Sequence, residues 1–298
     1  MLRASVLLLA LAACGAPTPA LRALPPAARP AEAPAALQAE LERLAAPFGD
    51  RVGVAVQPVV GGWIAAVNGD HPFQQQSVFK TWLAVTVLDA VERGALRWDE
   101  PIRLTRADLI FPHQPIEAEV GPRGRDFTVE ALLRWSVAAS DNPSTDALIA
   151  RLGGPAAVQA ALTRLGVDGV RVDVGERELH AMGRALRAAL EAAPADRAAV
   201  YARDFADRRN TATPGATVAA LARLQRGELL SAASTARLLQ VMTETTTGPM
   251  RLKAGTPAGW ALAHKTGTSG AYEGATSAAS FSCSASGLRV PQMKTATA

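Results

Sequence analysis

Ser77 and Lys80 are the first pair of residues whose types and spacing could do chemistry. They belong to a Ser-x-x-Lys tetrad at the start of a predicted helix. Because positions i and i+3 share one face of a helix, the lysine amine can reach the serine hydroxyl. A serine hydroxyl is a weak nucleophile until a neighbouring base takes its proton, and a helix N-terminus offers free N–H groups to an oxyanion. Taken alone, however, the tetrad is more often the start of an ordinary helix.

Two further motifs follow at long intervals. A Ser-Asp-Asn motif begins at Ser140, between two predicted helices, and alone it is typical of a helix-capping turn. A Lys-Thr-Gly motif begins at Lys265, in a predicted strand, and alone it is compatible with any edge strand. In this order the three motifs match the signature of serine enzymes that recognise penicillin. Two of the four lysines of the chain lie in these motifs.

The chain resembles the class A serine β-lactamases from about Leu37 to about Ala279. The resemblance includes the contexts TVEALLRWSVAASDNPSTDALIARLGG and TTTGPMRLKAGTPAGWALAHKTGTSG, and the final motif resembles the extended-spectrum branch. Class A enzymes carry a catalytic glutamate five residues after an arginine, and Glu176 has that position after Arg171. Penicillin-binding transpeptidases lack this glutamate, so Glu176 separates a hydrolase from a transpeptidase.

The resemblance implies a two-step hydrolysis of the β-lactam amide. Ser77 attacks the lactam carbonyl, assisted by Lys80 or by Glu176 through a water, and the acylation base of the family is disputed between the two. Water activated by Glu176 then releases the product from the acyl-enzyme. The backbone N–H groups of Ser77 and Thr268 are expected to stabilise the oxyanion, and Ser140 to pass a proton to the departing lactam nitrogen.

The resemblance also implies substrate-binding roles and no cofactor. Asn142 is expected to hold Lys80 and the substrate amide. Arg251 occupies the place where many relatives keep a second cation for the substrate carboxylate, with a solvated arginine as the alternative. The residues expected around that carboxylate are Lys265, Thr266, Gly267 and Thr268. A metal-dependent hydrolase is disfavoured, because ligand spacing is absent among the histidines His71, His113, His180 and His264.

Two features near the expected cleft depart from the family. His180 replaces an asparagine that helps to hold the hydrolytic water; an imidazole can substitute as donor or acceptor, or it slows deacylation. The segment between His180 and Thr213 is longer than in most relatives. It predicts either a larger loop beside the cleft with a wider substrate range, or a neutral insertion. Phe111 or His113 is expected to wall the cleft.

The tail, residues 280–298, is the most serious departure. Class A chains continue past this point with strands and a terminal helix, whereas this chain reads SFSCSASGLRVPQMKTATA. That segment is rich in serine and has neither helical periodicity nor a strand pair. We expect a frameshift or a truncated gene, which would leave a gap in the sheet and expose unpaired backbone. Translation of the other reading frames after Ala279 tests this hypothesis.

The elements that must position the motifs follow from periodicity and caps. Helices are predicted over 35–46, from Ser77 to near Gly94, from Thr128, from Asn142 as N-cap to Gly153, over 155–165, over 181–195, from Thr213 and over 231–243. A hairpin is predicted at 51–67, a loop at 171–180 and a strand at 259–269. Helices fill the middle of the chain and strands both ends. This pattern predicts a two-lobed α+β or α/β fold, in which an all-α lobe, about 78–213, is inserted into a lobe with an antiparallel sheet flanked by helices.

Composition bounds the class of protein. The chain has 298 residues, 49% of them hydrophobic, which suffices for one large domain or two closely joined lobes. The net charge of +4 comes from scattered arginines, so no nucleic-acid partner is expected. The only cysteines are Cys14 and Cys283, which cannot build a disulfide framework or a cysteine metal site.

The N-terminal region predicts export. Residues 1–14 resemble a secretory signal that ends in a lipobox, with Cys14 as the lipidated residue or, alternatively, incidental to ordinary cleavage. Residues 15–34 read as a Pro/Ala-rich tether and 35–279 as the catalytic domain. We therefore expect a monomeric periplasmic protein with a small-molecule β-lactam substrate, and a membrane contact only through a lipid anchor.

Two other classes of function remain open at this point. One is a DD-peptidase or transpeptidase of cell-wall synthesis, or less readily a serine glutaminase of related fold. Glu176 argues against the first of these. The other is a non-catalytic penicillin-binding sensor or a damaged homologue, and the unusual tail favours the damaged form.

Overall fold

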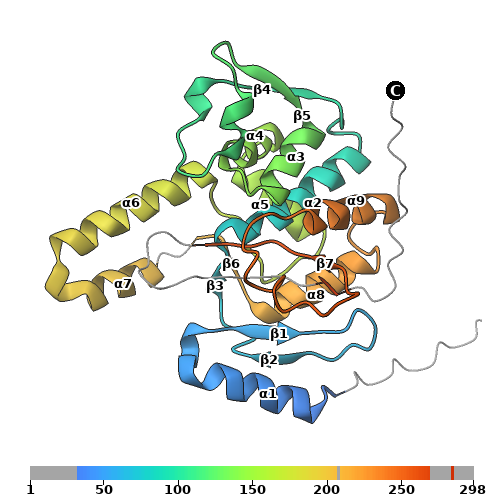
Figure 1. Ribbon diagram of the computed structural model, residues 1–298, viewed down its shortest axis with the longest axis vertical. Helices are drawn as coiled ribbons and strands as arrows, with labels where there is room; N and C mark the ends of the chain where they lie inside the picture. The colour runs from blue at the N-terminus through green and yellow to red at the C-terminus, as the bar shows by residue number, and fades with distance from the viewer. Residues whose placement is uncertain (1–31, 207–208, 269–282, 285–298) are drawn as a thin grey trace, which may run out of the picture.

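The computed structural model describes residues 32–206, 209–268 and 283–284. Figure 1 shows β4 and β5 at one end of the molecule, β1 and β2 with α1 at the other end, and α2, α5 and α9 between them. The helices are α1 (Ala35–Ala45), α2 (Phe79–Glu92), α3 (Val129–Ala138), α4 (Asn142–Leu152), α5 (Pro155–Arg164), α6 (Glu176–Ala192), α7 (Arg197–Ala206), α8 (Pro214–Gln225) and α9 (Ala232–Thr243). The 3-10 helices are η1 (Ala46–Arg51), η2 (Gln76–Val78), η3 (Arg106–Asp108), η4 (Pro115–Glu119) and η5 (Pro194–Asp196). The strands are β1 (Val54–Val56), β2 (Ala65–Val67), β3 (Phe73–Gln74), β4 (Pro101–Leu104), β5 (Arg125–Thr128), β6 (Thr211–Ala212), β7 (Leu262–Ala263) and β8 (Cys283–Ser284).

The described strands pair antiparallel, each with one partner: β1 with β2, β3 with β6, β4 with β5, and β7 with β8. The predicted hairpin is confirmed by the first of these pairs, in which Val54 lies opposite Val67. Its connection passes through Gly61 and Gly62, whose φ values of 129° and 73° suit glycine. The chain is thus an α+β protein, as the sequence predicts.

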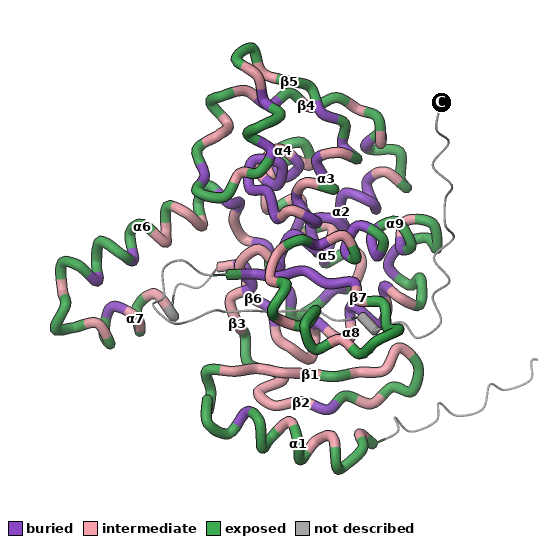
Figure 2. Tube along the Cα trace, in the orientation of Figure 1, coloured by how far each residue is buried: buried purple, intermediate pink, exposed green. Residues whose placement is uncertain are grey.

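The centre of the core is α2. Every residue from Phe79 to Ala90 is buried, and helices α3, α4, α5 and α9 pack against it. A helix that is buried on all sides is enclosed by other elements, and Figure 2 shows α2 as a buried segment inside the helical body. Because α2 follows Ser77 directly, the helical body fixes the position of the tetrad.

Several helix ends lie where the sequence predicts them. Thr128 caps α3 by accepting a hydrogen bond from the backbone N–H of Ala131, and Thr213 caps α8 in the same way. Gly94, with φ 70°, follows the end of α2 as predicted. These ends depend on contacts within a few residues, which explains why local patterns identified them.

The cap of α4 was predicted wrongly. Asp141, and not Asn142, is the N-cap, because its carboxylate accepts hydrogen bonds from the backbone N–H and the hydroxyl of Ser144, at 2.8 and 2.6 Å. Asn142 is instead the first residue of the helix, and its side chain is used elsewhere, by Lys80. A carboxylate is as good a cap as an amide, and here it leaves the amide free for the site.

The prediction for 171–195 was also wrong at its boundary. The sequence predicts a loop to His180 and a helix from 181, whereas α6 begins at Glu176 and ends at Ala192. The early start has a tertiary cause, because Asp146 of α4 accepts hydrogen bonds from the first N–H groups of α6. A cap from another element replaces the local signal that the sequence lacks.

Helices α6 and α7 form an arm, defined as Glu176–Ala206. Figure 1 shows the arm projecting from the helical body. Its two helices pack on each other through the buried side chains of Leu186, Leu190 and Val200. The lengthened segment of the sequence is therefore a helical hairpin, with its own small hydrophobic contact.

The strand predicted over 259–269 is shorter in the structure. Only Leu262–Ala263 is strand, and its described partner is Cys283–Ser284, in a tail for which no strand is predicted. The rest of the tail, the expected gap in the sheet, Cys14 and the signal segment lie outside the described residues. In the described part of the chain, no helix is long and apolar enough to cross a membrane.

Candidate active site

The backbone around Ser77 is held in a tight 3-10 turn. The preceding residue, Gln76, has φ 47°, an uncommon conformation for a residue with a side chain. Gln75 is buried, and its side-chain amide donates to the carbonyl oxygens of Arg171 and Thr211, at 2.9 and 3.1 Å. Its amide oxygen accepts from the indole N–H of Trp82, at 2.8 Å. The turn that carries Ser77 is therefore tied to α2 and to the segment before Glu176.

Lys80 is fully buried and has three oxygen atoms around its ammonium nitrogen. Its Nζ donates to the backbone carbonyl of Ser140 at 2.7 Å and to Oδ1 of Asn142 at 2.6 Å. It also forms an ion pair with Oε1 of Glu176 at 3.0 Å. The structure thus brings together residues from α2, α4, α6 and the Ser-Asp-Asn turn, which are up to 96 residues apart in the chain.

The carboxylate of Glu176 is buried beside Lys80. Its Oε1 accepts no hydrogen bond of good geometry from a described residue, so it has capacity to accept one from a water or a ligand. Its Oε2 lies 3.7 Å from Nε2 of His180. A buried carboxylate that is balanced by one lysine and keeps accepting capacity suits a general base.

Asp146 holds the backbone of Glu176 in place. Its Oδ1 accepts from the backbone N–H of Glu176 at 2.6 Å, and its Oδ2 from that of Arg177 at 3.0 Å. Burial raises the pKa of Asp146, and the two backbone N–H groups oppose that rise. A Cβ atom at Gly175 would lie 2.7 Å from Oδ1 of Asp146, so glycine lets the carboxylate approach.

His180 contacts the site through Asn142. Its Nε2 lies 2.9 Å from Nδ2 of Asn142, and its ring lies against that of Phe111, with the centroids 5.6 Å apart. Burial lowers the pKa of His180; Glu176 opposes this effect, while Lys80 and the nearby arginines of α6 add to it. The imidazole is therefore held in its neutral form at neutral pH.

Ser140 links the two lysines of the motifs. It has φ 60°, a second uncommon conformation in this site. Its carbonyl accepts from Lys80, and its hydroxyl accepts from Nζ of Lys265 at 2.8 Å. Burial and the charge of Lys80 place the pKa of Lys265 well below its usual range. Ser140 is thus positioned to exchange a proton within a chain of polar groups.

The end of the Lys-Thr-Gly segment carries hydroxyl groups and a cation. Thr266 shares a short hydrogen bond of 2.5 Å between its hydroxyl and that of Thr247. Arg251 donates to the carbonyl of Gly267 at 3.1 Å and to the hydroxyl of Thr268 at 2.8 Å. A Cβ atom at Gly267 would lie 2.4 Å from the carbonyl oxygen of Gln75. Glycine there lets this segment lie against the turn that carries Ser77.

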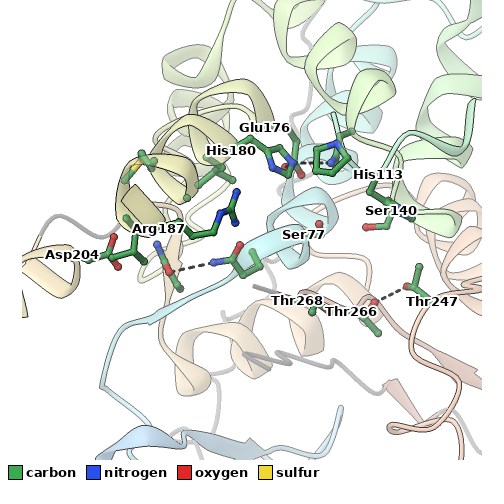
Figure 3. A pocket seen from close by; sticks show the side chains of 18 residues that line it. Ser77, His113, Ser140, Glu176, His180, Arg187, Asp204, Thr247, Thr266 and Thr268 are labelled. Atoms are coloured by element: carbon green, nitrogen blue, oxygen red, sulfur yellow. Dashed lines mark hydrogen bonds and ion pairs between the residues drawn. The ribbon is translucent and has the colours of Figure 1, made fainter. Parts of the chain in front are cut away.

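These groups surround a pocket of about 490 Å³, shown in Figure 3. The lining residues come from the turn that carries Ser77, the Ser-Asp-Asn turn, the arm and the Lys-Thr-Gly segment. The predicted site residues that line the pocket are Ser77, Ser140, Asn142, Glu176, His180, Thr266 and Thr268. Lys80 and Lys265 are buried behind its wall, and Arg251 reaches it through Thr268. Of the two residues expected to wall the cleft, His113 lines the pocket and Phe111 contacts His180.

Several residues that the structure places at or beside the site were not predicted from the sequence. They are Gln75, Asp146, Thr247 and, on the arm, Met182, Gly183, Leu186, Arg187 and Asp204. None belongs to a motif, and their roles depend on contacts between elements. Among the residues that the structure describes, no cluster of three His, Cys, Asp or Glu side chains could hold a metal ion.

Several known proteins to which this chain is similar are β-lactamases. The sequence model described as the β-lactamase enzyme family matches residues 36–279. The chain is similar to extended-spectrum β-lactamase PER-1 of Pseudomonas aeruginosa, with 34% identity over 215 residues, 71% of this chain and 62% of the relative. It is similar to carbapenem-hydrolysing β-lactamase KPC of Klebsiella oxytoca, with 31% identity over 225 residues, 76% of this chain and 69% of the relative. The chain therefore spans less than two thirds of PER-1.

Solved structures agree with these relatives. A β-lactamase from Chitinophaga pinensis DSM 2588 matches with a TM-score of 0.64 and 34% identity, over 78% of each chain. A class A β-lactamase described as the last common ancestor of Gram-negative bacteria matches with a TM-score of 0.65 and 34% identity, over 79% of this chain and 81% of that one. The predicted fold class is confirmed by these similarities.

Proposed function

This chain belongs to the β-lactamase enzyme family, and we propose that it is a class A serine β-lactamase, which hydrolyses penicillins or cephalosporins through an acyl-enzyme at Ser77. One observation carries the proposal: the buried carboxylate of Glu176 is paired with Lys80 at 3.0 Å in the wall of the pocket that Ser77 lines. A nucleophile and a carboxylate base in one pocket are what an acylation and a hydrolysis require.

The contacts of Lys80 favour Glu176 as the base of acylation. Nζ of Lys80 donates hydrogen bonds to two oxygen atoms and forms an ion pair with a third, Oε1 of Glu176, at 3.0 Å. A lysine amine engaged with these three oxygen atoms is poorly placed to take the proton of Ser77. Glu176 takes it through an intervening water, and the positive charge of Lys80 stabilises the developing oxyanion.

Ser140 completes the acylation. Collapse of the tetrahedral intermediate breaks the C–N bond of the lactam, and the nitrogen needs a proton. The hydroxyl of Ser140 supplies it, while Lys265, at 2.8 Å, stabilises the serine oxygen. The proton that Glu176 took from Ser77 then returns to the Ser140 oxygen through the polar groups between them, so that both residues are restored before deacylation. Lys265, Thr266, Thr268 and Arg251 attract the ring carboxylate of the substrate, while the amide of Asn142 binds the acylamino group.

Glu176 also drives deacylation, by taking a proton from the water that attacks the ester. This role disfavours the transpeptidase alternative, because a transpeptidase protects its acyl-enzyme from water. The contacts of Asn142 with Lys80 at 2.6 Å and with His180 at 2.9 Å support an assembled site.

The test is the hydrolysis of a chromogenic cephalosporin by the purified chain without residues 1–14. We expect turnover by this protein and none by the Ser77→Ala variant. Because Glu176 is the proposed base of both steps, Glu176→Gln should slow acylation and deacylation, deacylation by about 100-fold or more. The acyl-enzyme that does form should then persist, visible as a mass increase on the protein. A stable acyl-enzyme on the unmodified chain, unchanged by Glu176→Gln, would instead support a transpeptidase or a sensor.

We further propose that the chain is exported to the periplasm and acts there as a monomer. The basic start and apolar run of residues 1–14 support export, and the lipobox supports lipidation of Cys14. Mass spectrometry of the membrane fraction should find a lipid on Cys14, and Cys14→Ala should release the protein. An unlipidated N-terminus would contradict the anchor, and sedimentation of the purified chain tests the monomer.

A further inference from the structure

The arm forms one wall of the pocket. This wall carries charged side chains that have no role in the proposed mechanism. Met182, Gly183, Leu186 and Arg187 of α6 line the pocket, with Asp204 of α7. In Figure 3 Arg187 and Asp204 lie on one side of Ser77, and Thr247 and Thr266 lie on the other. The pocket therefore has two ends, with the nucleophile between them.

Arg187 is the cation of this second end. Its side chain is exposed and points into the pocket in Figure 3, and it forms no ion pair with any residue that the structure describes. Long side chains on a helix lie over the preceding turn, and Gly183, four residues earlier, leaves that space open. Arg187 can therefore extend along α6 toward His180.

Neither of the two carboxylates that line the pocket, those of Glu176 and Asp204, forms an ion pair with Arg187. Glu176 is paired with Lys80, and Asp204 has an interaction of its own. His180 is held neutral, and the charge of Arg187 contributes to the lowering of its pKa. An arginine of this kind is suited to a planar carboxylate, which it can bind through two N–H groups.

The chemistry of the substrate decides which of its groups reaches this end. The ring carboxylate and the acylamino group of a penicillin lie at opposite ends of its fused rings. If Thr266, Thr268 and Arg251 bind the ring carboxylate, the acyl side chain extends from Asn142 toward α6. There the apolar side chains of Met182 and Leu186 can pack against an aryl group.

We propose that Arg187 is a specificity-determining residue, which binds an anionic group on the acyl side chain of a β-lactam. The substrates that it favours carry a carboxylate close to an aryl or other apolar group. This inference rests on the proposed function and adds a second anion-binding subsite, separate from that of the ring carboxylate.

The test compares benzylpenicillin with its α-carboxy derivative, which differs only by that carboxylate. Purified wild-type chain, Arg187→Gln, Arg187→Lys and Arg187→Glu are assayed with both. The control is Arg184→Gln, which removes an exposed arginine one turn earlier on α6 that does not line the pocket.

In Arg187→Gln, kcat/KM for the carboxylated substrate should fall about threefold to fivefold, because the lost contact is an exposed ion pair. The kcat/KM for benzylpenicillin should change less than about twofold. The loss should be in KM, because the contact is the same in the ground state and the transition state. The kcat/KM for the carboxylated substrate should fall further in Arg187→Glu and less in Arg187→Lys. It should change little in Arg184→Gln. The preference of the wild-type chain should shrink near about 1 M salt.

Equal effects of Arg187→Gln on both substrates, or an equal effect of Arg184→Gln, would overturn the subsite while leaving the proposed function intact. If neither substrate is turned over, the proposed hydrolysis is wrong. The rate at which each substrate acylates Ser77, followed by mass spectrometry, then decides about Arg187. No acylation by either substrate would overturn both.

Discussion

The amide of Asn142 lies between two groups with different hydrogen-bonding needs. Lys80 can only donate, so it requires the amide oxygen, and the distance of 2.6 Å to Oδ1 satisfies it. The amide nitrogen then faces Nε2 of His180 at 2.9 Å. Because Nδ2 is a donor, Nε2 must be an acceptor, and the proton of the neutral imidazole is on Nδ1. The orientation of one amide thus fixes a tautomer.

Protonation of His180 should impair the base. It would turn Nε2 into a donor that repels the amide nitrogen of Asn142 and is attracted to Oε2 of Glu176, now 3.7 Å away. Burial places the pKa of His180 below its ordinary value, so the imidazole stays neutral until the pH falls below about 6.5. We expect kcat to fall as the pH drops through the pKa of His180, while the His180→Asn variant keeps its activity to lower pH.

The measurement is the pH profile of kcat for both proteins, with nitrogen chemical shifts of the imidazole to identify the tautomer. An identical acid limb in both profiles would show that His180 does not control the base. A proton on Nε2 at neutral pH would contradict the assignment of the tautomer.

At the scale of elements, the start of α6 decides where Glu176 lies. Asn210 accepts hydrogen bonds from the backbone N–H groups of Asp173 and Val174, at 2.7 and 3.0 Å, and its backbone carbonyl accepts from Gln75. Asp146 then binds the first N–H groups of the helix. The segment before Glu176 is therefore fixed to the turn that carries Ser77 and to α4. These contacts start α6 at Glu176 without a capping signal in the local sequence.

Replacement of Asp146 should disturb the position of Glu176 without removing a residue that contacts the substrate. In Asp146→Ala the first turn of α6 loses its cap, which costs about 1–2 kcal/mol of folding free energy. A shift of Glu176 by about 1 Å should slow deacylation about 100-fold. Asp146→Asn, which keeps one acceptor, should retain more activity. Single-turnover kinetics should show acyl-enzyme accumulating, and the steady-state KM should fall together with kcat because deacylation has become the slower step.

Gly175→Ala tests the same contact from the other side. The added Cβ would meet Oδ1 of Asp146 at 2.7 Å, so the carboxylate or the helix start must move. Deacylation should slow in this variant too, and the double variant with Asp146→Ala should be less impaired than the sum of the single changes predicts. Additive effects, or acyl-enzyme that does not accumulate in either single variant, would rule out a shared positioning role.

At the scale of the whole molecule, the joint between α9 and the Lys-Thr-Gly segment contains a buried histidine. His264 is 1% exposed, its backbone N–H donates to Met242, and its carbonyl accepts from the hydroxyl of Thr245. Neither ring nitrogen makes a hydrogen bond of good geometry to a described residue. Burial lowers its pKa, as do the charges of Lys253 and Lys265, while the backbone of Thr247 opposes the change.

This histidine should make the fold sensitive to acid. Because its pKa is lower in the folded than in the unfolded chain, its stabilising contribution is complete above about pH 6.5 and is lost as the pH falls through the folded pKa. Chemical unfolding between roughly pH 5 and 8 should give a steeper loss of unfolding free energy for the wild-type chain than for His264→Phe. The other three histidines are common to both proteins, so parallel curves would exclude His264 as the cause.

The sequence by itself determined the chemistry and much of the local structure. The spacing of Ser77 and Lys80 follows from the helical repeat, and the caps at Thr128 and Thr213 depend on side chains that bond within three residues. The order of the three motifs indicated the family, and the family implied Glu176. Each of these is a property of neighbouring residues or of side-chain type, which a sequence displays directly.

The tertiary structure alone decided how those groups are held and what surrounds them. Asp146 contacts the start of α6 from 30 residues away, so the early beginning of that helix was missed. Asn142 lost the capping role to Asp141 because its amide bonds to Lys80, 62 residues earlier. Arg187 faces the pocket because the lengthened segment folds into a helical arm. Such contacts join residues that are remote in the chain, and only the packed fold brings them within hydrogen-bonding distance.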